Sequence, residues 1–276
     1  NLRARPTLVV TLGSGAERAQ SLELSYLTGG LAWKADYVAN LSADEKTLDL
    51  NGWVTLTNQS GAAYPNATLQ LVAGDVNQAP EPPRMAPMAA VPRMEKARGV
   101  AMKEEGLFEY HLYTLDRPTT LAANQTKQVA LLSATGVPVR KEYRLEGQSF
   151  WYTSVQGDLG DKLKAGVFVE FDNTEAQHLG MPLPKGIIRV YKRDSEGRAQ
   201  FVGEDRVDHT PRKETVRLKL GEAFDVTARR KQTDFKVLGR SGKYGSSTES
   251  AYEVAITNAK KEAVTARAAE PGFGAR

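Results

Sequence analysis

The sequence predicts an all-β protein made of tandem immunoglobulin-like antiparallel β-sandwiches, followed by the beginning of a third unit. Apolar and polar residues alternate in several segments, which is typical of half-buried strands in antiparallel sheets. In addition, an alternating segment that ends in an Asn and enters a short polar turn occurs three times, at Asn58, Asn173 and Asn258. Asn favours such places because it tolerates left-handed backbone angles and bonds its own backbone. No segment of ten residues or more shows apolar positions at helical spacing.

The spacing of the three Asn residues defines the expected units. They are separated by 115 and 85 positions, and the first separation becomes 84 when the 31 residues 76–106 are left out. A repeat of this length fits immunoglobulin-sized sandwiches better than the shorter solenoid repeats. We therefore expect a first sandwich at residues 1–145, a second at 146–240 and an incomplete third β unit at 241–276.

The individual strands follow in order along the chain. Residues 31–41 alternate so that Leu31, Trp33 and Tyr37 share one face, and we expect Trp33 and Tyr37 to lie in the core. Residues 48–56, 167–171 and 216–220 repeat the alternation. Clusters of Gly, Asn, Asp and Ser separate these segments at residues 29–30, 60–61, 194–197 and 241–245, as expected for turns.

A second correspondence supports the repeat. Residues 117–120 precede a strand at 127–132, and residues 209–211 precede a similar strand at 214–220. Each unit thus holds its Asn turn early and this strand late, an order that gives about seven strands per unit, as in immunoglobulin-type sandwiches.

Residues 76–106 differ from the rest of the chain in composition. They contain five of the 13 prolines and four of the five methionines. Consecutive prolines disfavour both helices and strand ladders, so we expect a flexible insertion in the first sandwich. The alternative is a segment that binds a partner, because exposed methionines adapt to varied apolar surfaces.

The third unit is expected to hold two strands within residues 249–268, with Tyr252, Val254 and Ile256 on the first and Val264 on the second. Two strands alone are marginally stable in water. We therefore expect them either to dock on the second sandwich or to pair with something outside this chain.

Composition and charge exclude several classes of protein. The chain has no Cys, which excludes disulfides, thiolate metal sites and a Cys nucleophile. No segment approaches the roughly 20 apolar residues of a membrane helix, so we expect no transmembrane segment. The net charge is −2 over residues 1–185 and +6 over 186–276. A basic second half is compatible with an anionic polymer or membrane surface, but interleaved acids favour a solvated face, and no nucleic-acid partner is predicted.

Recognisable catalytic motifs are absent, including a nucleophile elbow, a phosphate loop, a zincin motif and a dinucleotide fingerprint. The best polar cluster is residues 203–211, with Glu204, Asp205, Asp208 and His209 as candidate metal ligands or acid–base groups. On an extended strand Asp205 and His209 would be about 13 Å apart, at roughly 3.3 Å per residue. The favoured interpretation is a strand end whose carboxylates bond backbone amides and Arg206. No catalytic, cofactor-binding or metal-binding residue is therefore assigned, and no cofactor is expected.

An aromatic group at Trp151 and Tyr152, directly after Phe150, has two interpretations. In the first, the rings form a platform for sugar rings. In the second, they begin a strand and divide between the core and the surface. The second interpretation is favoured, because aromatic residues in sandwiches most often supply apolar contact area.

Four longer segments carry a resemblance to a known family. Residues 24–37, 71–75, 179–191 and 201–205 resemble the DUF4139 domain family, the C-terminal region of mucoidy-inhibitor-like proteins, over nearly the whole chain. The resemblance implies a β-rich bacterial protein made with a signal peptide and placed in the cell envelope, periplasmic or extracellular. It carries no catalytic or ligand-binding residue over to this sequence. Members of the family usually continue beyond the third Asn turn with more strands.

Together these observations predict a non-catalytic module that binds or scaffolds in the cell envelope, with a protein or an envelope polysaccharide as its partner. The alternative is a hydrolase or metal-dependent enzyme acting on envelope polymers, with Glu204, Asp208 and His209 as its site. Convergent side chains in a concave pocket would favour the enzyme, whereas salt-bridged carboxylates on a flat surface would favour the module.

Overall fold

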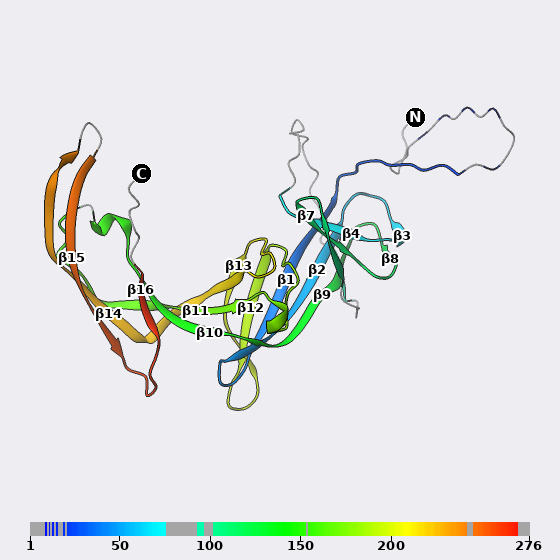
Figure 1. The fold of residues 1–276 in the computed structure, drawn as a ribbon. Coiled ribbons are helices and arrows are strands. Elements are labelled where there is room, and N and C mark those ends of the chain that lie inside the picture. The colour runs from blue at the N-terminus through cyan, green and yellow to red at the C-terminus, as the bar shows by residue number, and fades with distance from the viewer. Residues whose placement is uncertain are drawn as a thin grey trace. The chain divides into compact units, whose positions relative to one another are not determined.

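The fold is built almost entirely from strands (Figure 1). The computed structural model describes residues 9, 11, 13, 15, 19, 21–75, 93–96, 102–152, 154–241 and 245–269. The only helical elements in these residues are two short 3-10 helices, η1 (Ser149–Tyr152) and η2 (Glu175–Gln177). The predicted all-β class is therefore confirmed.

The strands lie in four sheets. Over the described residues the orders are β13-β12-β1-β2-β9-β5, β15-β14-β11-β10-β16, β4-β7-β6 and β3-β8. Most pairs are antiparallel, while β5 runs parallel to β9 and β16 runs parallel to β10. The strands are β1 (Leu31–Leu41), β2 (Thr47–Asn58), β3 (Tyr64–Ala67), β4 (Gln70–Ala73), β5 (Arg93–Lys96), β6 (Lys103–Leu107), β7 (Tyr110–Thr114), β8 (Thr119–Leu121), β9 (Gln125–Pro138), β10 (Arg140–Glu146), β11 (Asp158–Asp172), β12 (Gly186–Arg193), β13 (Ala199–Val207), β14 (Thr215–Ser241), β15 (Gly245–Asn258) and β16 (Ala266–Ala269).

Two compact units divide the chain, and neither is continuous in sequence. Unit 1 comprises Asn1–Tyr37, Asn51–Ser133 and Pro182–Gly186, and unit 2 comprises Val38–Leu50, Ala134–Met181 and Ile187–Arg276. The expected boundaries at residues 145 and 240 do not coincide with this division. Strand β10, which ends at Glu146, pairs with β11, and β14 runs through residue 240 and pairs with β15.

The alternation of apolar and polar residues in the sequence matches the alternation of buried and exposed residues along the strands. In β1 every second residue from Ala35 to Leu41 is buried, and β14 buries Val216 and Leu218 in the same way. The expectation for Tyr37 is confirmed, since its side chain is fully buried, whereas Trp33 is only half-buried. Trp33 is near the start of β1, where the strand begins to leave the core.

Unit 1 is organised around two buried tyrosines. The Tyr37 hydroxyl donates a hydrogen bond to Pro184 O at 2.7 Å, and the Tyr113 hydroxyl donates to Pro182 O at 2.8 Å. Burial raises the pKa of Tyr37, and the neighbouring Tyr113 adds to the shift, so the Tyr37 hydroxyl stays a protonated donor. The two bonds hold residues 182–186 against the body of unit 1.

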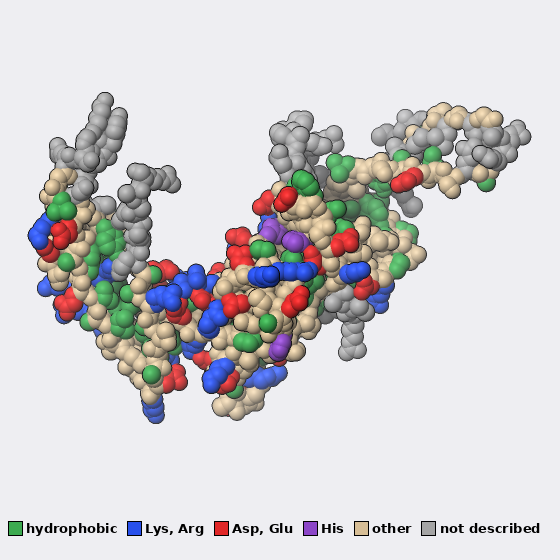
Figure 2. Space-filling view, in the orientation of Figure 1, with side chains coloured by type: hydrophobic (Ala, Val, Ile, Leu, Met, Phe, Trp, Pro, Cys, Tyr) green, Lys and Arg blue, Asp and Glu red, His purple; other side chains and the backbone are tan. Residues whose placement is uncertain are grey.

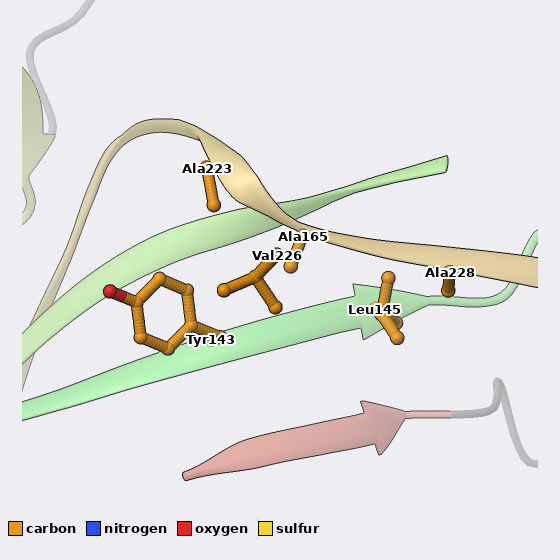
Figure 3. Close-up of a cluster of buried hydrophobic side chains, with 6 residues drawn as sticks. All are labelled: Tyr143, Leu145, Ala165, Ala223, Val226 and Ala228. Atoms are coloured by element: carbon orange, nitrogen blue, oxygen red, sulfur yellow. The ribbon is translucent and has the colours of Figure 1, made fainter. Parts of the chain in front are cut away.

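Unit 2 has a core formed by strands that lie next to each other in one sheet. Tyr143 and Leu145 of β10, Ala165 of β11, and Ala223, Val226 and Ala228 of β14 form a buried cluster (Figure 3). Val254 of β15, Ala266 of β16 and Val264, which precedes β16, pack against the same cluster. Figure 2 shows hydrophobic side chains gathered on the inner side of the β14–β15 pair. The expected strands of residues 249–268 thus pair within this chain, β15 with β14 and β16 with β10.

Each of the three Asn residues ends a strand, as expected. Asn58 closes β2 by donating to Ala62 O at 2.7 Å and accepting from Ser60 N at 3.0 Å. Asn258 closes β15 in the same way, donating to Glu262 O at 2.8 Å and accepting from Lys260 N at 3.0 Å. In both turns the partners are the fourth and the second residue after the Asn, so the two turns have the same hydrogen-bond pattern.

Asn173 follows β11 and serves a longer connection. Its side chain donates to Met181 O at 2.9 Å and accepts from Gly180 N at 3.0 Å. It also donates to Pro211 O at 3.0 Å, as Asn58 donates to Ala122 O at 2.9 Å. Pro211 precedes β14 and Ala122 precedes β9, so the second correspondence found in the sequence is matched by equivalent hydrogen bonds.

The expected insertion at residues 76–106 is longer than the structure supports. Residues 93–96 form β5, Met102 is buried, and residues 103–107 form β6, which pairs with β7. Met102, one of the four methionines of this stretch, is therefore a core residue. Residues 76–92 and 97–101 lie outside the described part of the chain.

Candidate functional site

The polar cluster of residues 203–211 does not form a convergent site. Glu204 pairs with Arg189 at 3.0 Å, and Asp205 accepts hydrogen bonds from the amides of Arg206 at 2.8 Å and Lys219 at 2.7 Å. Asp205 thus bonds backbone amides, as the favoured interpretation has it, whereas Glu204 pairs with Arg189 and not with Arg206. Within the described residues, no group of three or more His, Asp or Glu side chains is arranged to hold a metal ion.

The two remaining candidates lie beyond the end of β13. Asp208 is exposed and its backbone carbonyl accepts from the Thr210 hydroxyl at 2.9 Å, while His209 is half-buried. Glu204 is thus committed to Arg189 on β12, whereas Asp208 and His209 follow the strand. The geometry required of the alternative enzyme is therefore not assembled by these three residues.

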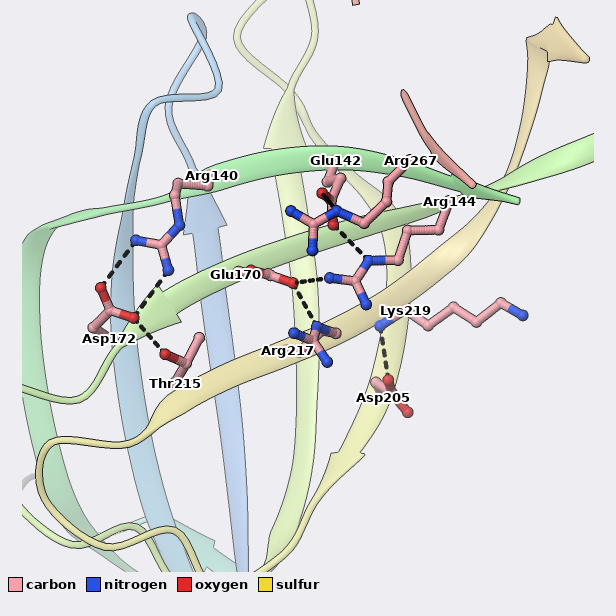
Figure 4. A network of polar contacts seen from close by, with 10 residues as sticks. All are labelled: Arg140, Glu142, Arg144, Glu170, Asp172, Asp205, Thr215, Arg217, Lys219 and Arg267. Carbon is pink, nitrogen blue, oxygen red and sulfur yellow. Dashed lines mark hydrogen bonds and ion pairs between the residues drawn. The ribbon is translucent and has the colours of Figure 1, made fainter. Parts of the chain in front are cut away.

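Charged side chains instead form a ladder across one face of the sheet of β16, β10, β11 and β14 (Figure 4). Glu170 accepts from Arg144 at 2.8 Å and from Arg217 at 2.5 Å. Glu142 is 2.5 Å from Arg144 and 2.9 Å from Arg267. Because each carboxylate binds an arginine of a neighbouring strand, the ladder ties four strands together.

One end of the ladder is a bidentate pair. Arg140 of β10 donates two hydrogen bonds of 2.9 Å to Asp172 of β11, which also accepts from the Thr215 hydroxyl of β14 at 2.7 Å. These bonds, from Arg140 first and then Thr215, hold the pKa of Asp172 well below its usual range. The pKa of Arg140 is raised by the same pairing. The carboxylate is thus kept ionised as a structural acceptor.

A second ionic clamp lies at the turn between β1 and β2. Glu45 accepts from Lys192 at 2.5 Å and from Lys141, so it joins the turn to β12 and β10. Burial opposes the ionised form of Glu45, but the two lysines outweigh it and the pKa is lowered. Both carboxylate oxygens of Glu45 thus accept hydrogen bonds from lysines, which link the turn to β10 and β12.

The aromatic group at residues 150–152 surrounds an arginine that the sequence did not single out. Arg230 of β14 is 3% exposed, and its guanidinium lies 4.6 Å from the Trp151 ring centroid and 4.8 Å from that of Tyr252. It also donates to the Tyr152 hydroxyl at 2.8 Å. The Trp151 face is therefore occupied by a cation, while Phe150 is exposed, so the rings divide between core and surface. The expectation that these residues begin a strand is wrong, because they form η1 and the next strand, β11, begins at Asp158.

Burial lowers the pKa of Arg230, and the guanidinium lines a hollow of about 280 Å³ together with Trp151, Leu163 and Val254. The stacked rings attach η1 to the β14–β15 pair. The burial of Arg230 could have been predicted from the sequence. Arg230 follows Val226 and Ala228 at period two, so it lies on the same face of β14 as these buried residues. It was missed because a charged residue at such a position is normally assigned to the solvent side.

The larger hollow lies in unit 1 and is apolar. We call it the β4 groove; its volume is about 460 Å³. It is lined by Leu31, Ala32, Trp33, Leu56, Thr57, Tyr64, Ala67, Thr68, Leu69, Gln70, Leu71, Val72, Thr119 and Leu121. Six consecutive residues, 67–72, take part, which indicates that the groove meets the edge of β4, because a sheet face is lined by alternate residues.

The longest free edge in the described residues is β15. It has 14 residues and one neighbour in its sheet, β14. Its sequence contains no Lys, Arg or Pro, the residues with which edge strands are commonly protected against pairing. The sequence analysis expects the strands of residues 249–268 to need a pairing partner. In the structure β15 pairs with β14 on one side, and its other side is the edge of the sheet.

Comparison with known proteins identifies a family for this chain. No curated protein and no solved structure matches the chain. Among the described residues, no helix is long and apolar enough to cross a membrane. The sequence profile of one family, described as "Domain of unknown function (DUF4139)", matches residues 22–271. Since this match covers most of the chain, the protein belongs to the DUF4139 family.

Proposed function

We propose that this protein is a non-catalytic binding or scaffolding module of the bacterial cell envelope, which takes up an extended segment of a protein partner along the edge of β15. The observation that carries the proposal is this 14-residue edge without Lys, Arg or Pro. An extended peptide adds to such an edge through main-chain hydrogen bonds, and side-chain pockets then supply specificity. The envelope location rests on the family resemblance.

The pairing of β14 with β15 identifies the backbone groups that a partner would meet. Ala259 N donates to Asp225 O at 2.8 Å, and Ala255 pairs with Arg229 in the same register. Because antiparallel ladders alternate, residues 255 and 257 direct their N–H groups toward β14, whereas residues 254 and 256 direct theirs outward. The outward groups of Val254 and Ile256 are the proposed contacts.

The chemistry of the edge favours a peptide over a polysaccharide. Its charged residues are Glu249 and Glu253, and Ile256 is 42% exposed. A strand with alternating apolar and basic side chains would match the outward amides, the exposed Ile256 and the two carboxylates together. A polysaccharide would offer no regular series of donors and acceptors at the strand repeat.

The test is site-specific photo-crosslinking in cells that produce the full-length protein. A photoreactive phenylalanine at position 255 is expected to yield a discrete protein adduct, and the adduct should be lost in Ile256→Pro, because proline removes an outward N–H. The matched control is the same label at Phe224, an 88% exposed residue of β14, the strand that pairs with β15 on the side opposite to its free edge. An adduct that survives Ile256→Pro, or equal labelling at position 224, would refute strand addition at β15.

A further inference from the structure

A short segment before β1 has the pattern of a strand but pairs with none. Apolar and polar side chains alternate over residues 22–26, from Leu22 to Tyr26, and Leu27, which is 95% exposed, ends the alternation. Leu22 is 65%, Leu24 53% and Tyr26 65% exposed, and no ladder between described strands includes them. Singly exposed apolar residues are ordinary, but three at period two in one segment indicate a strand whose buried face is uncovered.

The β4 groove of the same unit has the complementary features. Leu31, Trp33, Leu56 and Leu121 supply an apolar floor, and Val72 on its rim is 37% exposed. Strand β4 is at the end of its sheet, with β7 as its one neighbour among the described strands. The groove therefore combines an apolar surface with an open backbone edge.

The backbone register of β4 shows which groups face the groove. Leu115 N donates to Leu69 O at 3.0 Å, and Leu71 pairs with Tyr113 in the continuing ladder. By the alternation of antiparallel ladders, residues 69 and 71 are bonded to β7, whereas Gln70 and Val72 direct their N–H and C=O groups away from it. An added strand would bond these groups and cover the exposed side chains of Leu31 and Val72.

The segment leaves the body of unit 1 at a fixed point. Gly30 has φ +79°, and a Cβ there would lie 2.8 Å from the backbone of Gln59 and Ser60. Gln59 N also donates to Gly30 O at 2.6 Å. The next residue, Leu31, already lines the groove. Residues 21–28 of the same chain do not line this groove, and Leu22, Leu24 and Tyr26 stay exposed.

From this arrangement we propose that residues 21–28 of a second copy of this chain fill the β4 groove as an added strand. Leu22, Leu24 and Tyr26 lie on the apolar floor, and Glu23 and Ser25 face solvent beside Gln70 and Val72. Donor and acceptor lie in one unit, so two copies exchange segments reciprocally and the assembly closes as a two-fold dimer. The inference is independent of strand addition at β15.

The test uses the absence of cysteine from the chain. One preparation carries Ser25→Cys and another carries Gln70→Cys; both positions are exposed. The two are mixed and treated with a short bismaleimide, which tolerates a shift of register. A product of twice the chain mass of 30.1 kDa is expected. With one preparation isotope-labelled, the cross-link should join the peptide around position 25 of one copy to the peptide around position 70 of the other.

Each preparation treated alone is the control, since neither then contains the proposed pair. A double variant, Ser25→Cys with Gln70→Cys in one chain, tests the other occupant. Cross-linking within single chains at high dilution would overturn the proposal by showing that the segment enters its own groove. A mixed product no more abundant than in the controls would also overturn it.

A second measurement avoids chemical cross-linking. By sedimentation velocity the unaltered chain is expected to be a dimer, and Leu24→Glu is expected to shift it to monomer, because a carboxylate would be placed on the apolar floor. Glu23→Gln, which changes the solvent face, should leave the dimer intact. A monomeric unaltered chain at all concentrations would contradict the proposal.

Discussion

At the scale of single residues, three asparagines determine how the chain turns. Asn58 and Asn173 are fully buried, and each satisfies at least two backbone groups from segments far apart in sequence. Their role could be predicted because it depends on local chemistry: Asn bonds nearby backbone wherever it occurs. For the carboxylates of residues 203–211, the backbone-amide bonds of Asp205 match the expectation, whereas the pairing of Glu204 with Arg189 on β12 could not be read from local sequence.

Asn173→Ala is expected to lower the free energy of unfolding strongly. The substitution leaves Met181 O, Pro211 O and Gly180 N without their side-chain partner, at a cost of roughly 1–3 kcal/mol for each buried group left unsatisfied. Urea unfolding followed by tryptophan fluorescence measures the loss. The matched control is Asn258→Ala, which breaks the same kind of turn at an exposed position and should cost less. Equal losses for the two variants would show that the buried contacts of Asn173 add nothing.

The contacts of Arg230 could not be predicted from the residues next to it in the sequence. Its partners come from η1, 78 or 79 positions earlier, and from β15. Nothing local in the sequence indicates that Trp151, Tyr152 and Tyr252 converge on one guanidinium. Such a contact depends on the register of β14 against β11 and β15, which includes irregularities that no alternation pattern reveals.

At the scale of elements, long strands serve two parts of the fold in succession. Strand β14 has 27 residues; its first part pairs with β11 near Phe171, and its later part pairs with β15. The hydrogen bond from Gln59 N to Gly30 O at the end of β2 recurs at the end of β15, from Ala259 N to Asp225 O. The repeat detected in the sequence is therefore present in the hydrogen bonds, but its units share strands instead of following one another.

This sharing explains why the strands were predictable and the boundaries were not. Alternation reports whether a residue faces a core, and it located β1, β2, β11 and β14. It does not report which core the residue faces. Strand β14 continues through the predicted boundary at residue 240 without a break in its alternation. The sequence therefore contains no indication that residues 146–240 share a sheet with β10 and β15.

The ladder that joins β10, β11 and β14 makes a prediction for acid stability. The folded-state pKa of Asp172 is depressed by Arg140 and Thr215, so the unfolded chain binds a proton at higher pH than the folded chain does. The contribution of this carboxylate is present above its unfolded pKa, about 3.9, and is lost as pH falls through the lower folded value. Urea midpoints measured between pH 5 and pH 2 should therefore fall with acidification.

The same measurement on Asp172→Asn isolates this carboxylate. The variant is expected to be less stable at neutral pH and to lose less stability on acidification, because its side chain does not titrate. Arg140→Met removes the leading cause of the depressed pKa and should flatten the profile in the same direction. A profile for Asp172→Asn as steep as that of the unaltered protein would assign the acid sensitivity elsewhere.

At the scale of the whole molecule, charged and aromatic side chains serve mainly to join strands. Glu45, Glu170 and Asp172 each bind two or more side chains on different strands, and Arg230 joins η1 to β14 and β15. In Figure 2, basic and acidic side chains are interspersed on the face shown. Both proposed contacts therefore use backbone edges of described sheets, at β15 and at β4.

The most direct test of this account is residue-resolved amide hydrogen exchange along β15 by NMR. The account predicts an alternating pattern: slow exchange at Ala255 and Thr257, whose N–H groups face β14, and fast exchange at Val254 and Ile256, whose N–H groups face outward. Uniform protection of all four amides in the isolated chain would contradict it, because the edge of β15 would then already be covered.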